Sequence, residues 1–175
     1  MISQLGHDLE TCVGCGAQVP RITGPIHRYM TSSPGCWAMF GELTAFLYSG
    51  TQPMRHGRLC VDAYAVQHPG GQNPQAIQSV AVHLLSLYAQ LELSLPPAAA
   101  NEVMLIGTQQ KGRFHWLPAP SFAGSRTVGH VVASRDRADD AALEWATDAW
   151  RAWSRHHAMI ATWYGEIAKS RRISE

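Results

Sequence analysis

Three phrases near the N-terminus decide the fold that we expect: CVGCG at 12–16, GPIHRY at 24–29 and SSPGCW at 32–37. They place three cysteines and a histidine within 25 residues. In the first phrase two residues separate Cys12 from Cys15, and glycine stands inside the pair and directly after it. A tight turn of this kind aims two thiolates at one ion, and glycine accepts the positive φ that such a turn requires. We therefore predict a metal-binding knuckle.

A redox disulfide is the competing interpretation of the same cysteine pair. A redox CxxC stands at the start of a helix that follows a buried strand, because the helix N-terminus activates the first thiolate. Here the segment HDLET precedes Cys12, and Gly16 and Pro20 follow the pair. Neither flank has the redox pattern, so the sequence favours a metal ion.

The third phrase predicts the start of a helix. Ser33 is a good N-cap, and Pro34 fits the first helical position, where its missing N–H costs nothing. Cys36 then lies in the first turn, where free N–H groups and the helix dipole stabilise a thiolate. Phe40 and Leu43 follow it at helical spacing, so Cys36 faces inward. It can serve as a metal ligand, a nucleophile or a small buried apolar residue.

A closed zinc site has four ligands, and cysteine and histidine are preferred. Cys12, Cys15 and Cys36 supply three of them. His27 lies between the knuckle and the helix start and is the best fourth residue, with His83 as the alternative. We therefore expect a zinc ion held by the three cysteines and one of these two histidines.

Helix starts and apolar periodicity predict an all-α fold, a bundle of about five helices in a single domain over 1–175. We expect residues 1–35 to form the metal knuckle, packed on a helical core at 36–175. The expected helical segments are 34–47, 59–67, 75–93, 98–106, 140–169 and a short one at 127–132. The segment 75–93 is apolar nearly all round, which is typical of a buried central helix.

Four further side chains suggest a catalytic site. Asp62, His68 and His83 come from neighbouring helical segments, and His157 comes from the last one. Three histidines with a carboxylate can hold a metal that keeps one position for water, as in a metal-dependent hydrolase. In a thiol-dependent transferase, Cys36 would be the nucleophile and a histidine its base. A buried hydrogen-bond network among Asp62, Gln67 and the histidines is the simpler alternative.

The last expected helix carries four of the six tryptophans: Trp145, Trp150, Trp153 and Trp163. Its apolar residues recur every three or four positions, which indicates a seam toward another helix. His157 lies in this seam. Such a face belongs either to the core or to a homodimer interface, and the second option would make the protein an interaction or regulatory module.

Composition and charge exclude several classes of partner. The 175 residues carry a net charge of +1 and the sequence pI is about 7.8, so we expect no nucleic-acid or anionic-membrane partner. The longest apolar run, at 79–95, contains His83, Gln90 and Glu92 and is too short to span a membrane. The N-terminus has no signal-peptide pattern, and four cysteines without one indicate the cytoplasm.

Five longer phrases are specific enough to compare with known families: CVGCGA, GPIHRYMTSSPGCWAMFGEL, VDAYAVQHPG, QSVAVHLLSLY and WATDAWRAWSRHH. They resemble an uncharacterised bacterial family that is catalogued only as a domain of unknown function. The resemblance covers nearly the whole chain but implies no activity and no substrate. The residues that it places inside the family's signature phrases are His27, Cys36, Asp62, Gln67, His68 and His83. Cys60 stands where that signature has a threonine or a similar residue, so we leave it out of the site.

The first hypothesis is therefore that the chain is a cytoplasmic zinc-binding protein of unknown biochemical activity. The sequence does not identify a small-molecule ligand. The second is a metal-dependent hydrolase or thiol-dependent transferase that uses His68, His83 and His157, or Cys36. The third is a dimeric interaction module.

Overall fold

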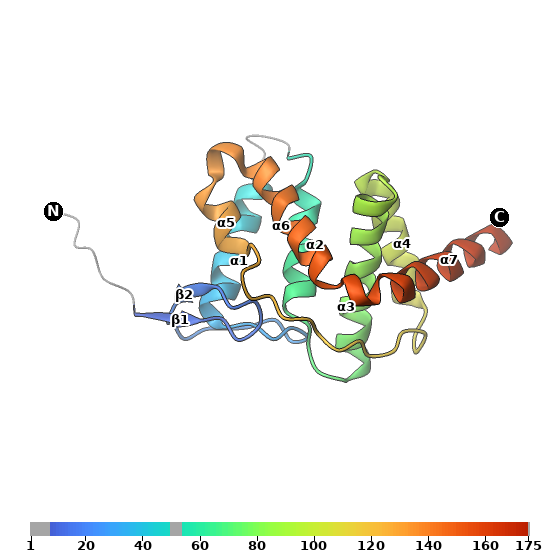
Figure 1. The fold of residues 1–175 in the computed structure, drawn as a ribbon, viewed down its shortest axis with the longest axis horizontal. Helices are drawn as coiled ribbons and strands as arrows, with labels where there is room; N and C mark the ends of the chain where they lie inside the picture. The colour runs from blue at the N-terminus through green and yellow to red at the C-terminus, as the bar shows by residue number, and fades with distance from the viewer. Residues whose placement is uncertain (1–7, 50–53, 175) are drawn as a thin grey trace.

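The computed structural model describes residues 8–49 and 54–174, with the backbone alone for 171–174. Within these residues the chain is mostly helical, as predicted, but a small two-stranded sheet precedes the helices (Figure 1). The strands are β1 (Leu9–Thr11) and β2 (Gln18–Pro20). The α-helices are α1 (Pro34–Leu47), α2 (Gly57–Gln67), α3 (Pro74–Leu87), α4 (Pro97–Gln109), α5 (Val128–Ala133), α6 (Ala138–Ala152) and α7 (His157–Ser174). A π-helical turn covers Tyr88–Glu92, and 3-10 turns cover Arg135–Arg137 and Ser154–His156.

Local signals set where the helices begin. α1 starts at Pro34 after Ser33, as predicted, and α3 starts at Pro74 after Asn73. The Asn73 side chain accepts a hydrogen bond of 2.9 Å from the Ala76 N–H, which satisfies one of the free amides of the first turn. None of the helices in the described ranges has the length and hydropathy needed to cross a membrane.

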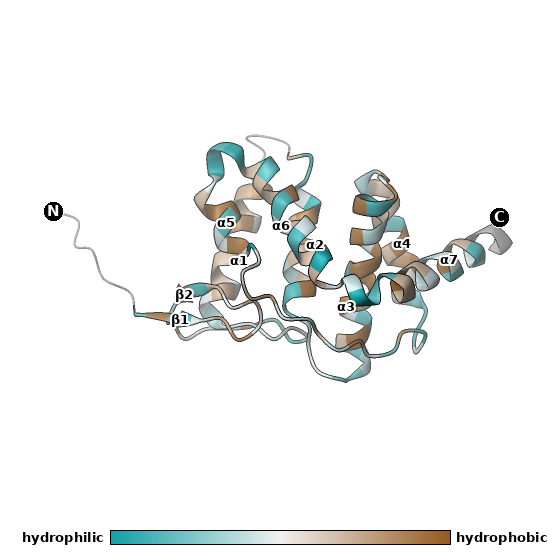
Figure 2. Cartoon of the chain, viewed as in Figure 1, coloured by the Kyte–Doolittle hydropathy of each residue, from teal (hydrophilic) through white to brown (hydrophobic). Residues whose placement is uncertain are grey.

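Helix α2 is the centre of the bundle (Figure 1). It packs against α6 and α3, while α5 joins α1 to α6, and α4 and α7 pack on α3. Figure 2 shows hydrophobic residues along most of α3, in agreement with its buried position. Two fully buried tryptophans fix the other side of α2. The ring N–H of Trp145 donates to the Gln67 side chain at 2.8 Å, and that of Trp153 donates to the Val66 carbonyl at 3.1 Å.

The helix predicted at 140–169 is two helices, α6 and α7, separated by a 3-10 turn. The Trp150 carbonyl explains the break, because it accepts a hydrogen bond from the Trp153 N–H at 3.0 Å and lies 3.0 Å from His157 Nε2. The His157 ring also stacks on the Trp150 ring, with centroids 3.8 Å apart. The His157 side chain thus hydrogen-bonds the Trp150 carbonyl, which in a continuous helix would accept a backbone N–H from the next turn. With this division and the short α5, the described chain has seven α-helices rather than about five.

The tryptophans of the predicted seam lie inside the chain. Trp145, Trp150, Trp153 and Trp163 have exposed fractions between 0% and 4%. Besides the contacts of Trp145 and Trp153 with α2, the Trp150 ring N–H donates to the Glu92 carboxylate at 2.6 Å. The homodimer stays a prediction, but the side chains on which it rested already have neighbours within one chain.

Candidate metal centre

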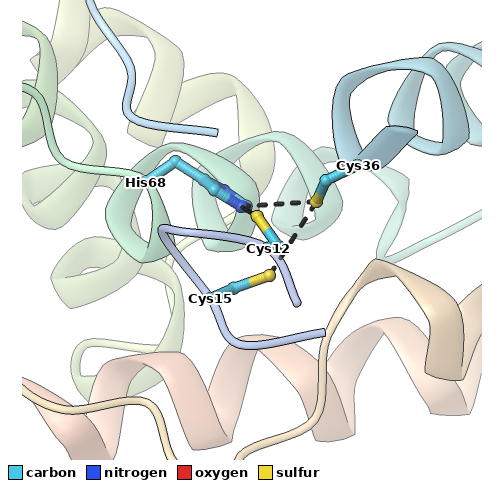
Figure 3. A group of neighbouring side chains, drawn as sticks. All are labelled: Cys12, Cys15, Cys36 and His68. Carbon is cyan, nitrogen blue, oxygen red and sulfur yellow. Dashed lines mark hydrogen bonds between the residues drawn. The ribbon is translucent and has the colours of Figure 1, made fainter. Parts of the chain in front are cut away.

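Four side chains from three parts of the chain converge on one point: Cys12, Cys15, Cys36 and His68 (Figure 3). We call them the Cys3His cluster. Their three sulfurs and one imidazole nitrogen all lie within 4.8 Å of one another. Among the described residues, no other group of histidines, cysteines and carboxylates has this metal-holding arrangement.

The separations within the Cys3His cluster are those of a tetrahedral site. The Cys15 and Cys36 sulfurs are 3.8 Å apart. His68 Nε2 lies 3.6 Å from the Cys12 sulfur and 3.4 Å from the Cys36 sulfur. Around a zinc ion with metal–sulfur bonds of about 2.3 Å, two sulfurs lie about 3.8 Å apart, and a sulfur and a nitrogen about 3.6 Å apart. One ion can therefore contact all four atoms without a large rearrangement.

A short hairpin turn presents Cys12 and Cys15. The Cys12 N–H donates to the Ala17 carbonyl at 2.8 Å, and the Gly16 N–H donates to the Cys12 carbonyl at 3.0 Å. Gly16, directly after the Cys12–Cys15 pair, has a φ of +76°, which confirms the positive φ that we expected glycine to allow in this turn. Gly14 has a different role, since a Cβ there would lie 2.2 Å from the Thr31 carbonyl oxygen and 2.5 Å from the His68 ring. Only glycine lets the turn approach His68 so closely.

Cys36 enters the Cys3His cluster from the first turn of α1, as predicted, and is fully buried. Strand β2 packs directly on this turn, because a Cβ on Gly35 would lie 2.1 Å from the Pro20 carbonyl oxygen. The Ser33 hydroxyl does not cap its own helix. It accepts a hydrogen bond of 3.3 Å from the Val13 N–H, and so ties the cysteine turn to the start of α1.

His68 stands directly after the last residue of α2. Its Nδ1–H donates to the Tyr64 carbonyl at 2.7 Å, one of the free carbonyls at the helix end. This hydrogen bond fixes the tautomer and leaves Nε2 to face the sulfurs, which is the usual arrangement of a metal-binding histidine. The Tyr64 ring lies against the His68 ring, with centroids 4.0 Å apart. The His68 carbonyl in turn accepts from the Thr31 N–H at 3.1 Å, which holds the loop before α1 in place.

Burial and mutual contacts shape the electrostatics of the Cys3His cluster, whose members are at most 2% exposed. Hydrogen bonds from Cys15 and Cys36 lower the pKa of the Cys12 thiol, and the bonds that Cys36 makes to Cys12 and Cys15 raise its own pKa. Burial lowers the pKa of His68, but the neighbouring Cys12 and Cys15 sulfurs outweigh burial and raise it to about 9. Within the cluster, Cys12 is thus shifted toward the thiolate, the form that binds metals, while Cys36 and His68 hold their protons more tightly.

Comparison with known protein families gives one match. The model of a family of unknown function, DUF5946, covers residues 10–154. The chain belongs to this family. Searches of curated proteins and of solved structures found no match. The DUF5946 region contains every member of the Cys3His cluster, and α7 lies outside it.

The two histidines that we expected to complete the site lie elsewhere in this DUF5946 chain. His27 is half-buried, its Nδ1 accepts a hydrogen bond of 3.2 Å from the Tyr29 N–H, and its ring packs against those of Tyr29 and Trp37. His83 contacts Asp62. The expectation of His27 or His83 beside the cysteines is therefore corrected: the structure places His68 there. His27 was expected because it is close to the cysteines in sequence. His68 takes the position because the end of α2 packs against the knuckle in the folded chain.

Asp62 is the centre of a second buried cluster, formed with Arg58, His83, Ser86 and Gln90, which we call the Asp62 cluster. Arg58 donates to both carboxylate oxygens at 3.3 Å, and His83 Nδ1 lies 2.8 Å from Oδ1. The Ser86 hydroxyl and the Gln90 amide donate to Oδ2 at 2.7 and 3.1 Å. The π-helical turn after α3 carries Gln90 toward the carboxylate. Donors occupy this carboxylate from all sides, so it resembles the predicted hydrogen-bond network rather than a metal ligand.

The catalytic constellation expected from the sequence is not assembled. Of its four members, only Asp62 and His83 are in contact. His68 belongs to the Cys3His cluster, and His157 stacks on Trp150. The end of α2 turns toward the knuckle, whereas α7 runs away from it beside α3 and α4 (Figure 1), so the histidines are separated.

Proposed function

We propose that the Cys3His cluster is a structural zinc site that holds the N-terminal hairpin onto the helical core of this DUF5946 protein. The observation that carries the proposal is the tetrahedral separation of four buried ligand atoms, with sulfurs 3.8 Å apart and sulfur–nitrogen separations of 3.4 and 3.6 Å. Three cysteines and one histidine are a standard donor set for structural zinc, and such sites are closed to water.

The residues around the site suit that role. Cys12, Cys15 and Cys36 would bind as thiolates and His68 through Nε2. An ion would supply the positive charge that these buried groups lack, together with a cross-link between the hairpin, α1 and α2. The hydrogen bond from His68 Nδ1 to the Tyr64 carbonyl orients the ring for that contact.

Burial favours this function over the thiol-transferase hypothesis. A nucleophile must reach its substrate, and Cys36 is 0% exposed. The other cysteines of the cluster are 2% exposed. We also infer that the protein works in a reducing compartment such as the cytoplasm, because free Cys15 and Cys36 sulfurs so close together would otherwise oxidise.

Metal analysis of the purified protein and of single variants tests the proposal. We expect about one zinc per chain, lost in Cys36→Ser and His68→Ala. Cys60→Ala is the matched control, because Cys60 is also a buried cysteine but lies outside the Cys3His cluster. It should keep its zinc. A metal-free wild-type protein whose Cys36 is rapidly alkylated near neutral pH would contradict the zinc site and favour a nucleophile.

A further inference from the structure

Two buried hydroxyl groups beside the Cys3His cluster have no hydrogen-bond partner. Tyr64 is 0% exposed and Ser32 is 5% exposed, and neither Tyr64 OH nor Ser32 Oγ is paired within the described residues. Unpaired buried hydroxyls are uncommon in folded proteins, because each one costs about 1–3 kcal/mol. Two of them at one place therefore require an explanation.

The two hydroxyls come from separate segments of the chain. Ser32 comes from the loop just before α1, and Tyr64 comes from the last turns of α2, where its ring stacks between Phe40 and His68 at 4.0 Å from each. The Tyr64 hydroxyl neighbours the side chains of both Ser32 and Cys36.

Cys36 has the complementary deficiency. Its sulfur lies 3.8 Å from the Cys15 sulfur and 3.4 Å from His68 Nε2, and in the described part of the chain it accepts no hydrogen bond from a backbone N–H. Cys12, by contrast, also accepts a hydrogen bond of 3.5 Å from the Ser33 backbone N–H. A zinc ion with three thiolates carries a net charge of −1, and in a buried site that charge needs donors around the sulfurs.

We propose that Tyr64 is a positioning residue that donates a hydrogen bond to the Cys36 thiolate of the loaded site, and that Ser32 supports it by donating to the Tyr64 hydroxyl. This inference rests on the proposed zinc site and adds the groups that hold its sulfur in place. With the hydroxyls rotated in this way, each of the two buried donors has an acceptor, and the Cys36 sulfur has a donor from outside the cluster. The Tyr64 hydrogen bond also stabilises the negative charge of the buried thiolate and opposes its protonation, which favours retention of the ion.

Cobalt-loaded variants test this role with a readout that a merely structural effect would not move. We expect Tyr64→Phe to shift the thiolate-to-cobalt charge-transfer band to longer wavelength, because a thiolate without that hydrogen bond is more easily oxidised. Zinc affinity, measured by competition with a chelator, should fall about 10- to 100-fold. Ser32→Ala should act in the same direction, and Ser32→Thr, which keeps a hydroxyl, should restore the wild-type values.

Tyr88→Phe is the matched control, since Tyr88 is half-buried against Trp150 and lies outside the Cys3His cluster. If Tyr64→Phe and Ser32→Ala bind cobalt and zinc as Tyr88→Phe does, with an unshifted band, the inference is wrong while the zinc site stands. If the wild-type protein itself binds neither metal, both the zinc site and its outer donors are wrong. If Tyr64→Phe does not fold, the comparison of Ser32→Ala with Ser32→Thr tests the inference by itself.

Discussion

Helix α2 carries two buried polar clusters that balance their charge in different ways. In the Asp62 cluster a single carboxylate accepts hydrogen bonds from four side chains, and the Arg58 guanidinium opposes its charge. In the Cys3His cluster four ligand atoms converge at the end of the same helix. The backbone donor that reaches them is the Ser33 N–H, at 3.5 Å from the Cys12 sulfur. The first cluster is electrically complete within the chain, whereas we propose that a cation completes the second.

This difference separates buried groups that stabilise the fold alone from groups that require an ion. Buried charge is tolerated where it is paired and hydrogen-bonded, and it is costly where it is not. Removing a member of the Asp62 cluster should therefore change stability without changing metal content. Removing a member of the Cys3His cluster should change both together.

The largest effect should follow metal removal. A structural zinc ion contributes about 10–16 kcal/mol of apparent binding free energy, so its loss exceeds the stability of most domains of this size. We expect a strong chelator to lower the thermal midpoint sharply or to unfold the protein, as followed by circular dichroism. Returning zinc should restore the transition. If metal analysis shows that all zinc has been removed and the thermal midpoint is unchanged, the zinc ion has no structural role.

Asp62→Ala should have the next largest effect. It leaves His83 and Arg58 without their shared partner, and removing one member of a buried ion pair costs about 3–5 kcal/mol. We expect the lower end of that range, because the Arg58 side chain is 25% exposed. Urea unfolding measures the loss, and the zinc content should stay at the wild-type level. A parallel loss of zinc would show that the two clusters depend on each other.

Gly14→Ala should act on the Cys3His cluster alone. The added Cβ would overlap the Thr31 carbonyl oxygen and the His68 ring, and overpacking of this kind costs about 1–3 kcal/mol. We expect weaker zinc binding in a chelator competition, because His68 must move. Gly41→Ala is the control: it adds a Cβ to an exposed turn of α1 with nothing within 4 Å, and should stabilise by about 0.5–1 kcal/mol. If Gly14→Ala and the wild-type protein bind zinc equally tightly, the close approach of the turn to His68 is contradicted.

The smallest effect concerns Cys60, a buried thiol of α2 that belongs to neither cluster. Burial, with smaller contributions from Asp139 and Asp62, raises the pKa of Cys60 from 9.0 to about 12. Between these values the folded state keeps a proton that the unfolded state has lost, so stability falls as pH rises above 9. The loss is about 1 kcal/mol per pH unit, and Cys60→Ala should remove it. Urea unfolding at pH 8 and pH 10 measures the stability of the wild-type protein and of Cys60→Ala. If both lose the same free energy of unfolding between these pH values, the raised pKa of Cys60 is contradicted.

The parts of the molecule that local chemistry determines could be predicted from the sequence. Pro34 after Ser33 marks a helix start because proline lacks the N–H that a first turn leaves free, and α1 does begin there. The inward direction of Cys36 followed from the helical spacing of Phe40 and Leu43, and all three are buried. The mostly helical fold rests on the same kind of local pattern.

The parts that depend on distant contacts could not be predicted in this way. His68 joins the cysteines because Pro69 and Gly70 end α2 and the chain turns back toward the knuckle; a Cβ on Gly70 would lie 2.3 Å from the Tyr29 carbonyl oxygen. A histidine directly after a helix, where carbonyls are free, is the signal that could have identified it. The break between α6 and α7 was missed because the apolar spacing continues through Trp153. The three-residue strands are too short for a periodic pattern.

The origin of the four ligand atoms in three distant segments has a consequence for the order of folding. Cys12 and His68 are 56 positions apart, and Cys36 and His68 are 32 positions apart. During synthesis from the N-terminus, the hairpin appears long before the residue that completes its site, and a two-stranded hairpin alone is marginal in water. Joining the ends of these loops costs chain entropy that the packing of α1 against α2 must first overcome. Coordination of an ion by all four atoms therefore requires that the helices meet first, so an ion bound there would lock a topology that has already formed.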